Sequence, residues 1–273
     1  MAEIITTSST VVRSGVFVYL HRYTFQKLWK HMMVYCKFAK TQILVLGRSG
    51  VGKSVLTSII LGENSDHAWV EPGISRDVEI KALTLKDSTK IITVVPGQGV
   101  FDRYAAIDKH FFKNTLEGLI YVADWGFTDL REEYLEKTLI DGGKESLEEI
   151  RKYNLQDELK DFEKIIDNLK NIRSNSKEPR WLLVAVTKFD LFANDETEAI
   201  KYYKDKNGEF YSIIHNLLNA IGENNIKVEI CFVSSKLDNF SWNGTTYQPQ
   251  LTSDIARRQK FREFVETLTE ISK

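Results

Sequence analysis

The chain has 273 residues, and its formal net charge of −1 gives no bulk attraction to nucleic acid or acidic lipid, so no nucleic-acid partner is expected. Its two cysteines, Cys36 and Cys231, exclude a disulfide framework or a cysteine-rich metal site and favour a reducing, cytoplasmic location. No apolar run reaches the ~20 residues that a membrane span needs, and the first residues lack the basic start of a signal peptide.

The first 40 residues are interpreted as an N-terminal extension. Residues 11–40 contain six lysines and arginines and no acidic residue, and apolar side chains from Phe25 to Cys36 recur at helical spacing. One interpretation is a helix packed on the chain's own sheet, which Trp29 and Met32 favour because they are good core material. The other is a basic amphipathic helix that contacts an anionic membrane or an acidic partner.

A phosphate-binding loop is the strongest motif of the chain. The sequence from Gly47 to Ser54 fits G-x-x-x-x-G-K-[ST] at every fixed position, between a strand expected over residues 42–46 and the start of a helix. Glycines allow several backbone N–H groups to converge on one anion, at the positive end of the helix dipole. Lys53 is expected to reach the β- and γ-phosphates, and Ser54 to bind Mg²⁺. The expected lining is Gly47, Ser49, Gly50, Val51, Gly52, Lys53, Ser54 and Val55.

Strand and helix patterns alternate through the middle of the chain. Strands are expected over residues 77–85, over residues 91–95 and up to Asp124. Residues 131–154, broken by two glycines, are interpreted as inserted helices whose mixed charges form a solvated face or, alternatively, a partner surface. The helix after them is expected to face the core with Leu155, Leu159, Phe162, Ile166 and Leu169.

A second motif indicates which base the chain binds. The apolar run of residues 181–186 is typical of a central parallel strand, and it leads directly into Thr187-Lys188-Phe189-Asp190. Asp190 can accept hydrogen bonds from guanine N1–H and the 2-amino group, whereas adenine would leave its carboxylate unpaired. Lys188 is expected to lie along the base plane. The [NT]-K-x-D spacing therefore favours guanine.

A third element agrees with this choice. A strand is expected over residues 228–233, and it ends in Ser234, Ser235 and Lys236, which are expected to contact the guanine oxygen through a backbone N–H. Residues 237–253 are interpreted as a long loop. Residues 254–273 are expected to form a helix with Ile255, Phe261, Phe264, Val265 and Leu268 facing inward.

In this order the motifs resemble the Ras-like branch of P-loop GTPases. The form Val95-Pro96-Gly97-Gln98, followed by Phe101-Asp102, is most similar to the bacterial MglA-type GTPases, and residues 109–115 and 118–124 are similar to the matching helix and strand of Arf-like and MglA-type small GTPases. The resemblance implies a first switch at residues 72–77, with Ser75 as an Mg²⁺ ligand and Arg76 as an internal arginine. It also implies that the Gly97 N–H binds the γ-phosphate and that Gln98 orients water. The usual metal-holding aspartate is replaced by Val94.

The expected fold class is α/β: a Ras-like P-loop domain over residues 41–273, with a mostly parallel sheet and helices on both faces. The expected function is a GTP-binding molecular switch that uses GTP or GDP with Mg²⁺, hydrolyses GTP slowly and regulates a protein effector. Gln98, Lys53 and Arg76 are the catalytic candidates, and Ser54 and Ser75 the metal candidates. Three alternatives remain: a pseudo-GTPase, which Val94 favours, an ATP-dependent phosphotransferase, which Asp190 argues against, and a scaffold.

Overall fold

The computed structural model describes residues 42–63, 78–85, 88–97, 116–130, 132–171 and 179–273. The predicted N-terminal helix and the predicted first switch, residues 72–77, lie outside the described residues, as do Cys36 and Gln98. Within the described part, no helix has both the length and the apolar character that a membrane crossing requires.

A six-stranded sheet forms the centre of the molecule, with the strand order β2-β3-β1-β4-β5-β6. All neighbouring pairs are parallel except β2 and β3, which are antiparallel. Every residue of β1, β4 and β5 is buried, which explains why these strands are nearly continuous apolar runs. The strands are β1 (Gln42–Leu46), β2 (Glu79–Leu85), β3 (Ser88–Val94), β4 (Leu116–Ala123), β5 (Trp181–Val186) and β6 (Lys227–Phe232).

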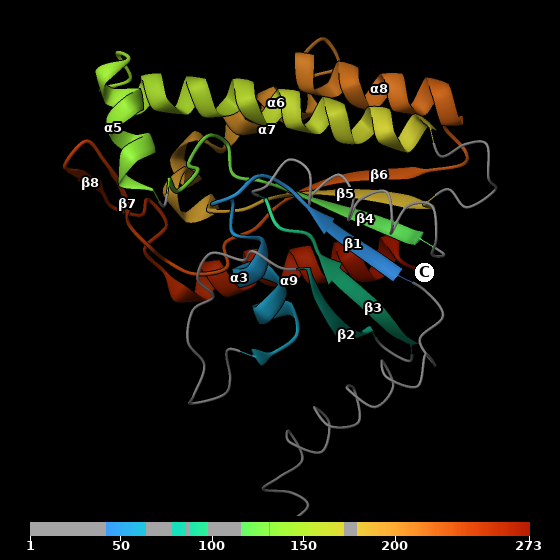
Figure 1. Ribbon diagram of the computed structural model, residues 1–273. Coiled ribbons are helices and arrows are strands. Elements are labelled where there is room, and N and C mark those ends of the chain that lie inside the picture. Colours follow the sequence, from blue (N-terminus) through green and yellow to red (C-terminus); the bar gives the residue numbers. More distant parts are fainter. Residues whose placement is uncertain (1–41, 64–77, 86–87, 98–115, 131, 172–178) are drawn as a thin grey trace, which may run out of the picture.

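Helices cover both faces of this sheet (Figure 1). One face carries α6 (Leu147–Asn171), α7 (Glu196–Lys204) and α8 (Glu209–Ile221), and the other carries α3 (Lys53–Ile60) and α9 (Asp254–Ile271). Each face has its own apolar core: Phe162 and Phe210 belong to the first, and Leu56 and Phe264 to the second. The predicted α/β fold class is confirmed.

The segment between β4 and β5 holds α5 (Glu133–Asp141), which has no buried residue, followed by α6. The predicted apolar face of α6 is right for Phe162, Ile166 and Leu169, whereas Leu155 and Leu159 are only half-buried. Two polar side chains, Asn154 and Glu158, occupy the buried face instead. Leucine spacing alone did not reveal them, because a polar residue enters a core only where it finds hydrogen-bond partners.

Two expectations for the C-terminal third are wrong. Residues 237–253 are not all loop: β7 (Phe240–Trp242) and β8 (Thr245–Tyr247) form a hairpin. Asn243 and Gly244, with φ of 48° and 71°, form its two-residue turn, for which Asn-Gly is the favoured pair. Ile255 is not inward either but 81% exposed, because the first turn of α9 extends past the sheet core that Phe264, Leu268 and Ile271 fill.

Candidate nucleotide-binding site

The phosphate loop joins β1 to α3 at the carboxyl edge of the sheet. Gly47, Gly50 and Gly52 all have positive φ, at 143°, 81° and 89°. At Gly50 a Cβ atom would lie 2.1 Å from the carbonyl oxygen of Asp129, so the tight approach of these two loops requires glycine. The loop directs its N–H groups and the start of α3 toward one point, which fits a phosphate group.

Two polar side chains, Lys53 and Ser54, stand at the start of α3. Lys53 is buried, and its Nζ donates to the carbonyl oxygens of Gly47, at 2.9 Å, and Arg48, at 2.6 Å. Its ammonium therefore lies across the loop, where phosphate oxygens can reach it. The Ser54 hydroxyl donates to Oε1 of Glu79 at 3.4 Å. A serine hydroxyl next to a phosphate cradle is a donor set that suits Mg²⁺, which prefers oxygen ligands.

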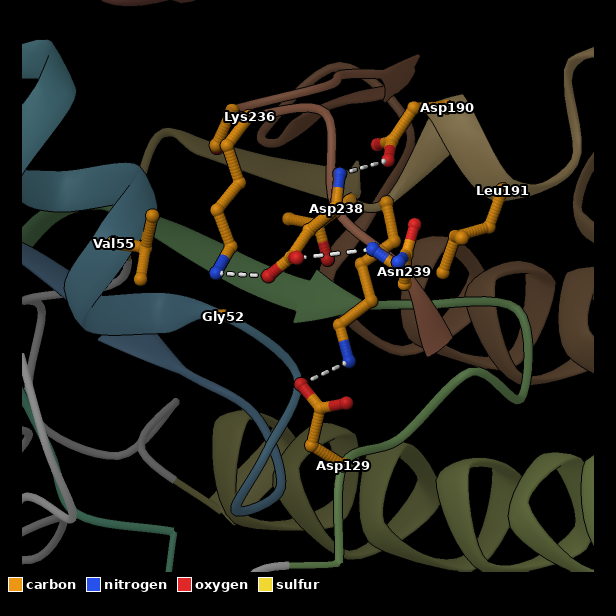
Figure 2. A pocket seen from close by; sticks show the side chains of 11 residues that line it. Gly52, Val55, Asp129, Asp190, Leu191, Lys236, Asp238 and Asn239 are labelled. Atoms are coloured by element: carbon orange, nitrogen blue, oxygen red, sulfur yellow. Dashed lines mark hydrogen bonds and ion pairs between the residues drawn. The ribbon is translucent and has the colours of Figure 1, made fainter. Parts of the chain in front are cut away.

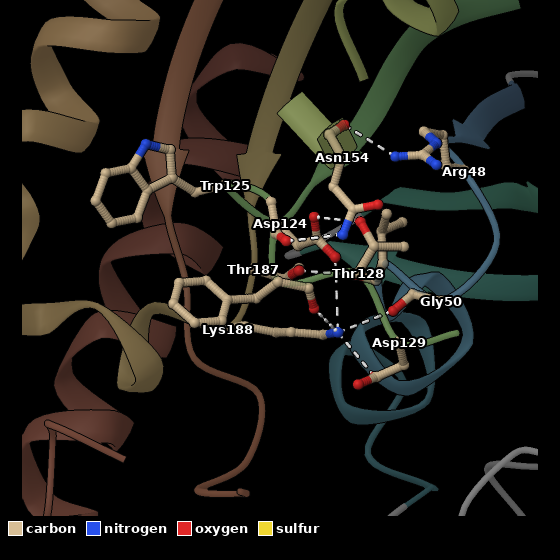
Figure 3. Close-up of polar contacts among 12 residues, drawn as sticks. Arg48, Gly50, Asp124, Trp125, Thr128, Asp129, Asn154, Thr187 and Lys188 are labelled. Atoms are coloured by element: carbon tan, nitrogen blue, oxygen red, sulfur yellow. Dashed lines mark hydrogen bonds and ion pairs between the residues drawn. The ribbon is translucent and has the colours of Figure 1, made fainter. Parts of the chain in front are cut away.

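Thr187 and Lys188 tie the end of β5 to the phosphate loop (Figure 3). The Thr187 hydroxyl lies 2.7 Å from the carbonyl oxygen of Val51. Lys188, in the left-handed conformation with φ of 56°, donates from Nζ to the Gly50 carbonyl at 3.0 Å and pairs with Asp129 at 2.7 Å. The base motif and the phosphate motif thus form one site.

Asp190 lies in the pocket beside these residues (Figure 2). Its carboxylate accepts from the Ser234 hydroxyl at 2.8 Å and from the backbone N–H of Asp238 at 3.2 Å. Burial raises the pKa of Asp190 above its usual value, and these two hydrogen bonds act in the opposite direction. Ser234 is fully buried and therefore positions Asp190. The pocket is lined by Gly52, Val55, Asp129, Thr187, Lys188, Asp190, Leu191, Ser235, Lys236, Asp238 and Asn239.

One buried polar atom of this pocket has no protein partner. The Ser235 hydroxyl oxygen is buried and makes no hydrogen bond among the described residues. A buried polar group without a partner is costly, so this hydroxyl fits a ligand that brings its own donors and acceptors. A purine base is such a ligand, and the pocket that Ser235 lines opens beside the phosphate loop.

A buried polar network supports the site from the side of α6 (Figure 3). Arg48, in the phosphate loop, donates to the carbonyl oxygen of Asn154 at 2.9 Å and pairs with Asp157 at 3.4 Å. Glu158 accepts from the backbone N–H of Asp124 at 3.2 Å and from the Tyr203 hydroxyl at 2.7 Å. These contacts fix the end of β4 against α6.

Glu158 gives the fold a dependence on pH. Burial, and secondly the nearby Asp124 carboxylate, raise the pKa of Glu158 from 4.5 to about 8. The folded chain therefore binds this proton more tightly than the unfolded chain, so stability should fall as pH rises from about 4.5 to about 8, by up to ~1.4 kcal/mol per pH unit. Glu158→Gln, which keeps the shape without the charge, should equal the parent near pH 5 and exceed it in unfolding free energy at pH 8.

Urea unfolding at both pH values would check this expectation. Glu163→Gln, at an exposed position of the same helix, is the matched control and should follow the parent. Parent and Glu158→Gln curves that stay parallel between pH 5 and pH 8 would contradict the assignment of Glu158 as a buried acid that is neutral at low pH.

The segment after β3, which ends at Gly97 among the described residues, reaches the phosphate loop. At Gly97 a Cβ atom would lie 2.2 Å from the backbone nitrogen of Ser49, so these two segments are in contact. Ser75, Arg76 and Gln98 lie outside the described residues, and their roles stay predictions. Asp129 and Asp238 were not predicted, because they belong to loops whose local sequence carries no motif and whose place depends on the assembled sheet.

The chain was compared with protein families, curated proteins and solved structures. The sequence model of the Gtr1/RagA G protein conserved region matches residues 42–244. No curated protein matches the chain.

Among solved structures, the mammalian SRP receptor is similar over 85% of this chain and 99% of the receptor chain, at 13% identity and a TM-score of 0.45. A dimerization-deficient mutant of Toc33 from Arabidopsis thaliana covers 88%, with 87% of its own chain, at 15% identity and a TM-score of 0.42. A particular closeness to MglA-type or Arf-like proteins stays a prediction.

Proposed function

The chain belongs to the Gtr1/RagA family of G proteins and is therefore a GTP-binding GTPase, and we propose that it is a molecular switch that hydrolyses GTP slowly with Mg²⁺ and regulates a partner protein. The observation that carries the proposal is Asp190, whose carboxylate is held by Ser234 and Asp238 in a pocket that Lys188 joins to the phosphate loop. Two fixed acceptor oxygens beside a phosphate cradle suit guanine and leave adenine unpaired.

The proposed switch uses the loops on the γ-phosphate side. Ser75 would bind Mg²⁺, and the Gly97 N–H would bind the γ-phosphate. Loss of that phosphate would release both loops and change the surface that an effector or regulator binds.

The proposal also divides the chain into two parts. They are an extension, residues 1–40, and a G domain, residues 41–273, with an insertion near 131–154. Residues 11–40 are proposed to pack on the domain's own sheet or, alternatively, to contact a partner protein or an anionic membrane.

The position of Arg48 supports the proposal of slow hydrolysis. Arg48 is the arginine of the phosphate loop, but its guanidinium is held by Asn154 and Asp157 of α6, so it is turned away from a transition-state role. Without such an arginine, Ras-type proteins hydrolyse GTP at only about 10⁻⁴ s⁻¹. Arg76 or a partner would have to supply this charge, with Gln98 orienting the attacking water.

A second candidate function is a pseudo-GTPase that keeps guanine nucleotide as a structural ligand. Val94 favours it, because this buried apolar side chain, only 1% exposed, stands where Ras-like proteins hold Mg²⁺ with an aspartate. The two functions differ in whether bound GTP is ever cleaved.

Single-turnover hydrolysis of bound GTP in excess Mg²⁺ separates them. We expect the isolated chain to cleave GTP no faster than about 10⁻³ s⁻¹ and Gln98→Leu to be slower still, because it loses the group that orients water. Lys53→Ala, which removes the ammonium at the phosphate loop, is the low-binding control and should lose at least about tenfold in GTP affinity. A rate near 1 s⁻¹ would contradict the proposed slow switch. A slow rate that Gln98→Leu leaves unchanged would favour the pseudo-GTPase.

A further inference from the structure

The residue at the end of β3, Val94, supplies no carboxylate to the proposed Mg²⁺ site. The described ligand of that site is Ser54 on α3. Mg²⁺ in nucleotide sites keeps several waters and is usually held by one or two carboxylates as well as phosphates. A G domain that binds Mg²⁺ with its nucleotide therefore needs an anionic group near Ser54 from another position.

The strand register brings an anionic group, the carboxylate of Glu79, close to Ser54. Glu79, the first residue of β2, is the cross-strand partner of Val94 in the antiparallel pair. Side chains of directly opposed residues point to the same face of a sheet. Val94 belongs to the apolar core on the face that α3 and α9 cover, and so does Leu83, four residues after Glu79 on β2. Glu79 therefore projects toward the face on which α3 begins.

The side-chain contacts agree with the register. Glu79 Oε1 lies 3.4 Å from the Ser54 hydroxyl oxygen. Its other oxygen, Oε2, lies 3.2 Å from Lys81 Nζ, and Lys81 is paired in turn with Glu63 at 3.1 Å. Lys81 thus orients the carboxylate so that one oxygen faces Ser54. Neighbouring ligands of an octahedral Mg²⁺ with bonds near 2.1 Å are about 3 Å apart, so a metal-bound water beside Ser54 would lie about 3 Å from the serine oxygen. Such a water could donate to the Glu79 oxygen, which lies 3.4 Å from the same serine oxygen.

We propose that Glu79 supplies the carboxylate of the Mg²⁺ site, taking the place on β2 that an aspartate at position 94 would take on β3. The carboxylate would accept a hydrogen bond from a metal-bound water next to Ser54, and it would add negative charge beside the ion. This inference rests on the proposed function, because it needs a guanine nucleotide in the phosphate loop. If Glu79 has this role, the carboxylate of the metal site has moved from position 94 to position 79 and has not been lost.

Metal affinity of the GDP-loaded 273-residue chain is the direct test, with Mn²⁺ as the probe and free Mn²⁺ followed by electron paramagnetic resonance. Glu79→Gln should bind Mn²⁺ at least about tenfold more weakly than the parent, as is typical when a group that orients a metal ligand is removed. Its GDP affinity in EDTA should equal that of the parent, because Glu79 acts through the metal. Glu63→Gln is the matched control: it removes the other carboxylate on Lys81 and should keep the parent's Mn²⁺ affinity.

The outcomes separate this inference from the proposed function. Equal Mn²⁺ affinity of Glu79→Gln and the parent, with GDP bound to both, would overturn the role of Glu79 and leave the proposed function standing. A loss of Mn²⁺ affinity of the same size in Glu63→Gln would also overturn it, since the effect would then come from general charge. A parent chain that binds no GDP in EDTA or in Mn²⁺ would overturn both.

Discussion

Asparagine in place of Asp190 is expected to reverse the base preference of this chain. The parent should bind GTP and GDP at least about a thousandfold more tightly than ATP and ADP, because a site built on hydrogen bonds rejects a base that leaves its acceptors unpaired. In Asp190→Asn one acceptor becomes an amide donor. Xanthine carries an oxygen where guanine carries its 2-amino group, so the variant should prefer xanthine nucleotides.

The local network can accommodate this change. Ser234 donates its proton to Asp190, but the carbonyl oxygen of Lys236 lies 2.9 Å from the same hydroxyl. The new amide can donate to Ser234, Ser234 can donate to Lys236, and the asparagine oxygen can still accept from the N–H of Asp238. We therefore expect the variant to fold normally, and a loss of guanine binding would report on recognition.

Competition titrations with GDP, ADP and xanthosine diphosphate would measure the preference of each protein. Asp195→Asn is the matched control: Asp195 ends the short 3-10 helix Ala193–Asp195, outside the residues that line the pocket, and its loss should leave the guanine preference unchanged. Equal affinity of the parent for ATP and GTP would contradict the base assignment, as would an Asp190→Asn variant that still prefers GDP.

The second large effect concerns folding rather than binding. Lys90 of β3 and Glu117 of β4 form an ion pair whose side chains are only 6% and 2% exposed. In the register, Ile91 and Leu116 flank Gln42 on its two sides; Lys90 precedes Ile91 and Glu117 follows Leu116, so the pair lies at the start of β1 and joins the strands on either side of it. Lys90 also donates to the carbonyl oxygen of Ser272 at 2.6 Å, which holds the end of α9.

Glu117→Ala should therefore lower the free energy of unfolding by about 3–5 kcal/mol, because it leaves a buried ammonium without its counter-charge. Replacing both partners by apolar residues, as in Lys90→Met with Glu117→Leu, should recover part of this loss. Urea unfolding would measure all three proteins. Glu229→Ala, on the exposed face of the edge strand β6, is the control and should change stability by less than about 0.5 kcal/mol. A Glu117→Ala effect as small as that of the control would contradict the account.

The sequence predicted those parts of the site whose functional residues are consecutive or nearly consecutive in the chain. The segment from Gly47 to Ser54 and the segment from Thr187 to Asp190 each have a fixed spacing, a buried strand before them and a defined backbone requirement. Position in the chain then determines position in the sheet, because parallel strands place their following loops at one edge. This is why both motifs meet in one pocket.

The remaining residues depend on contacts between distant segments. Glu158 is buried only because Tyr203 and the Asp124 N–H meet it in the folded chain. Glu79 acquires its place beside Ser54 through the strand register, which no local pattern contains. The hairpin turn at Asn243-Gly244, by contrast, has a recognisable local signal, because Asn-Gly is the favoured pair for a two-residue turn.

Whether this chain is a guanine-nucleotide switch can be tested through the nucleotide that copurifies with the 273-residue protein. The protein would be denatured, and the released nucleotide identified and quantified by chromatography against standards. We expect a guanine nucleotide, and GDP in particular, because a slow GTPase would have cleaved its GTP during purification. ATP or ADP in its place would contradict the assignment of guanine as the bound base.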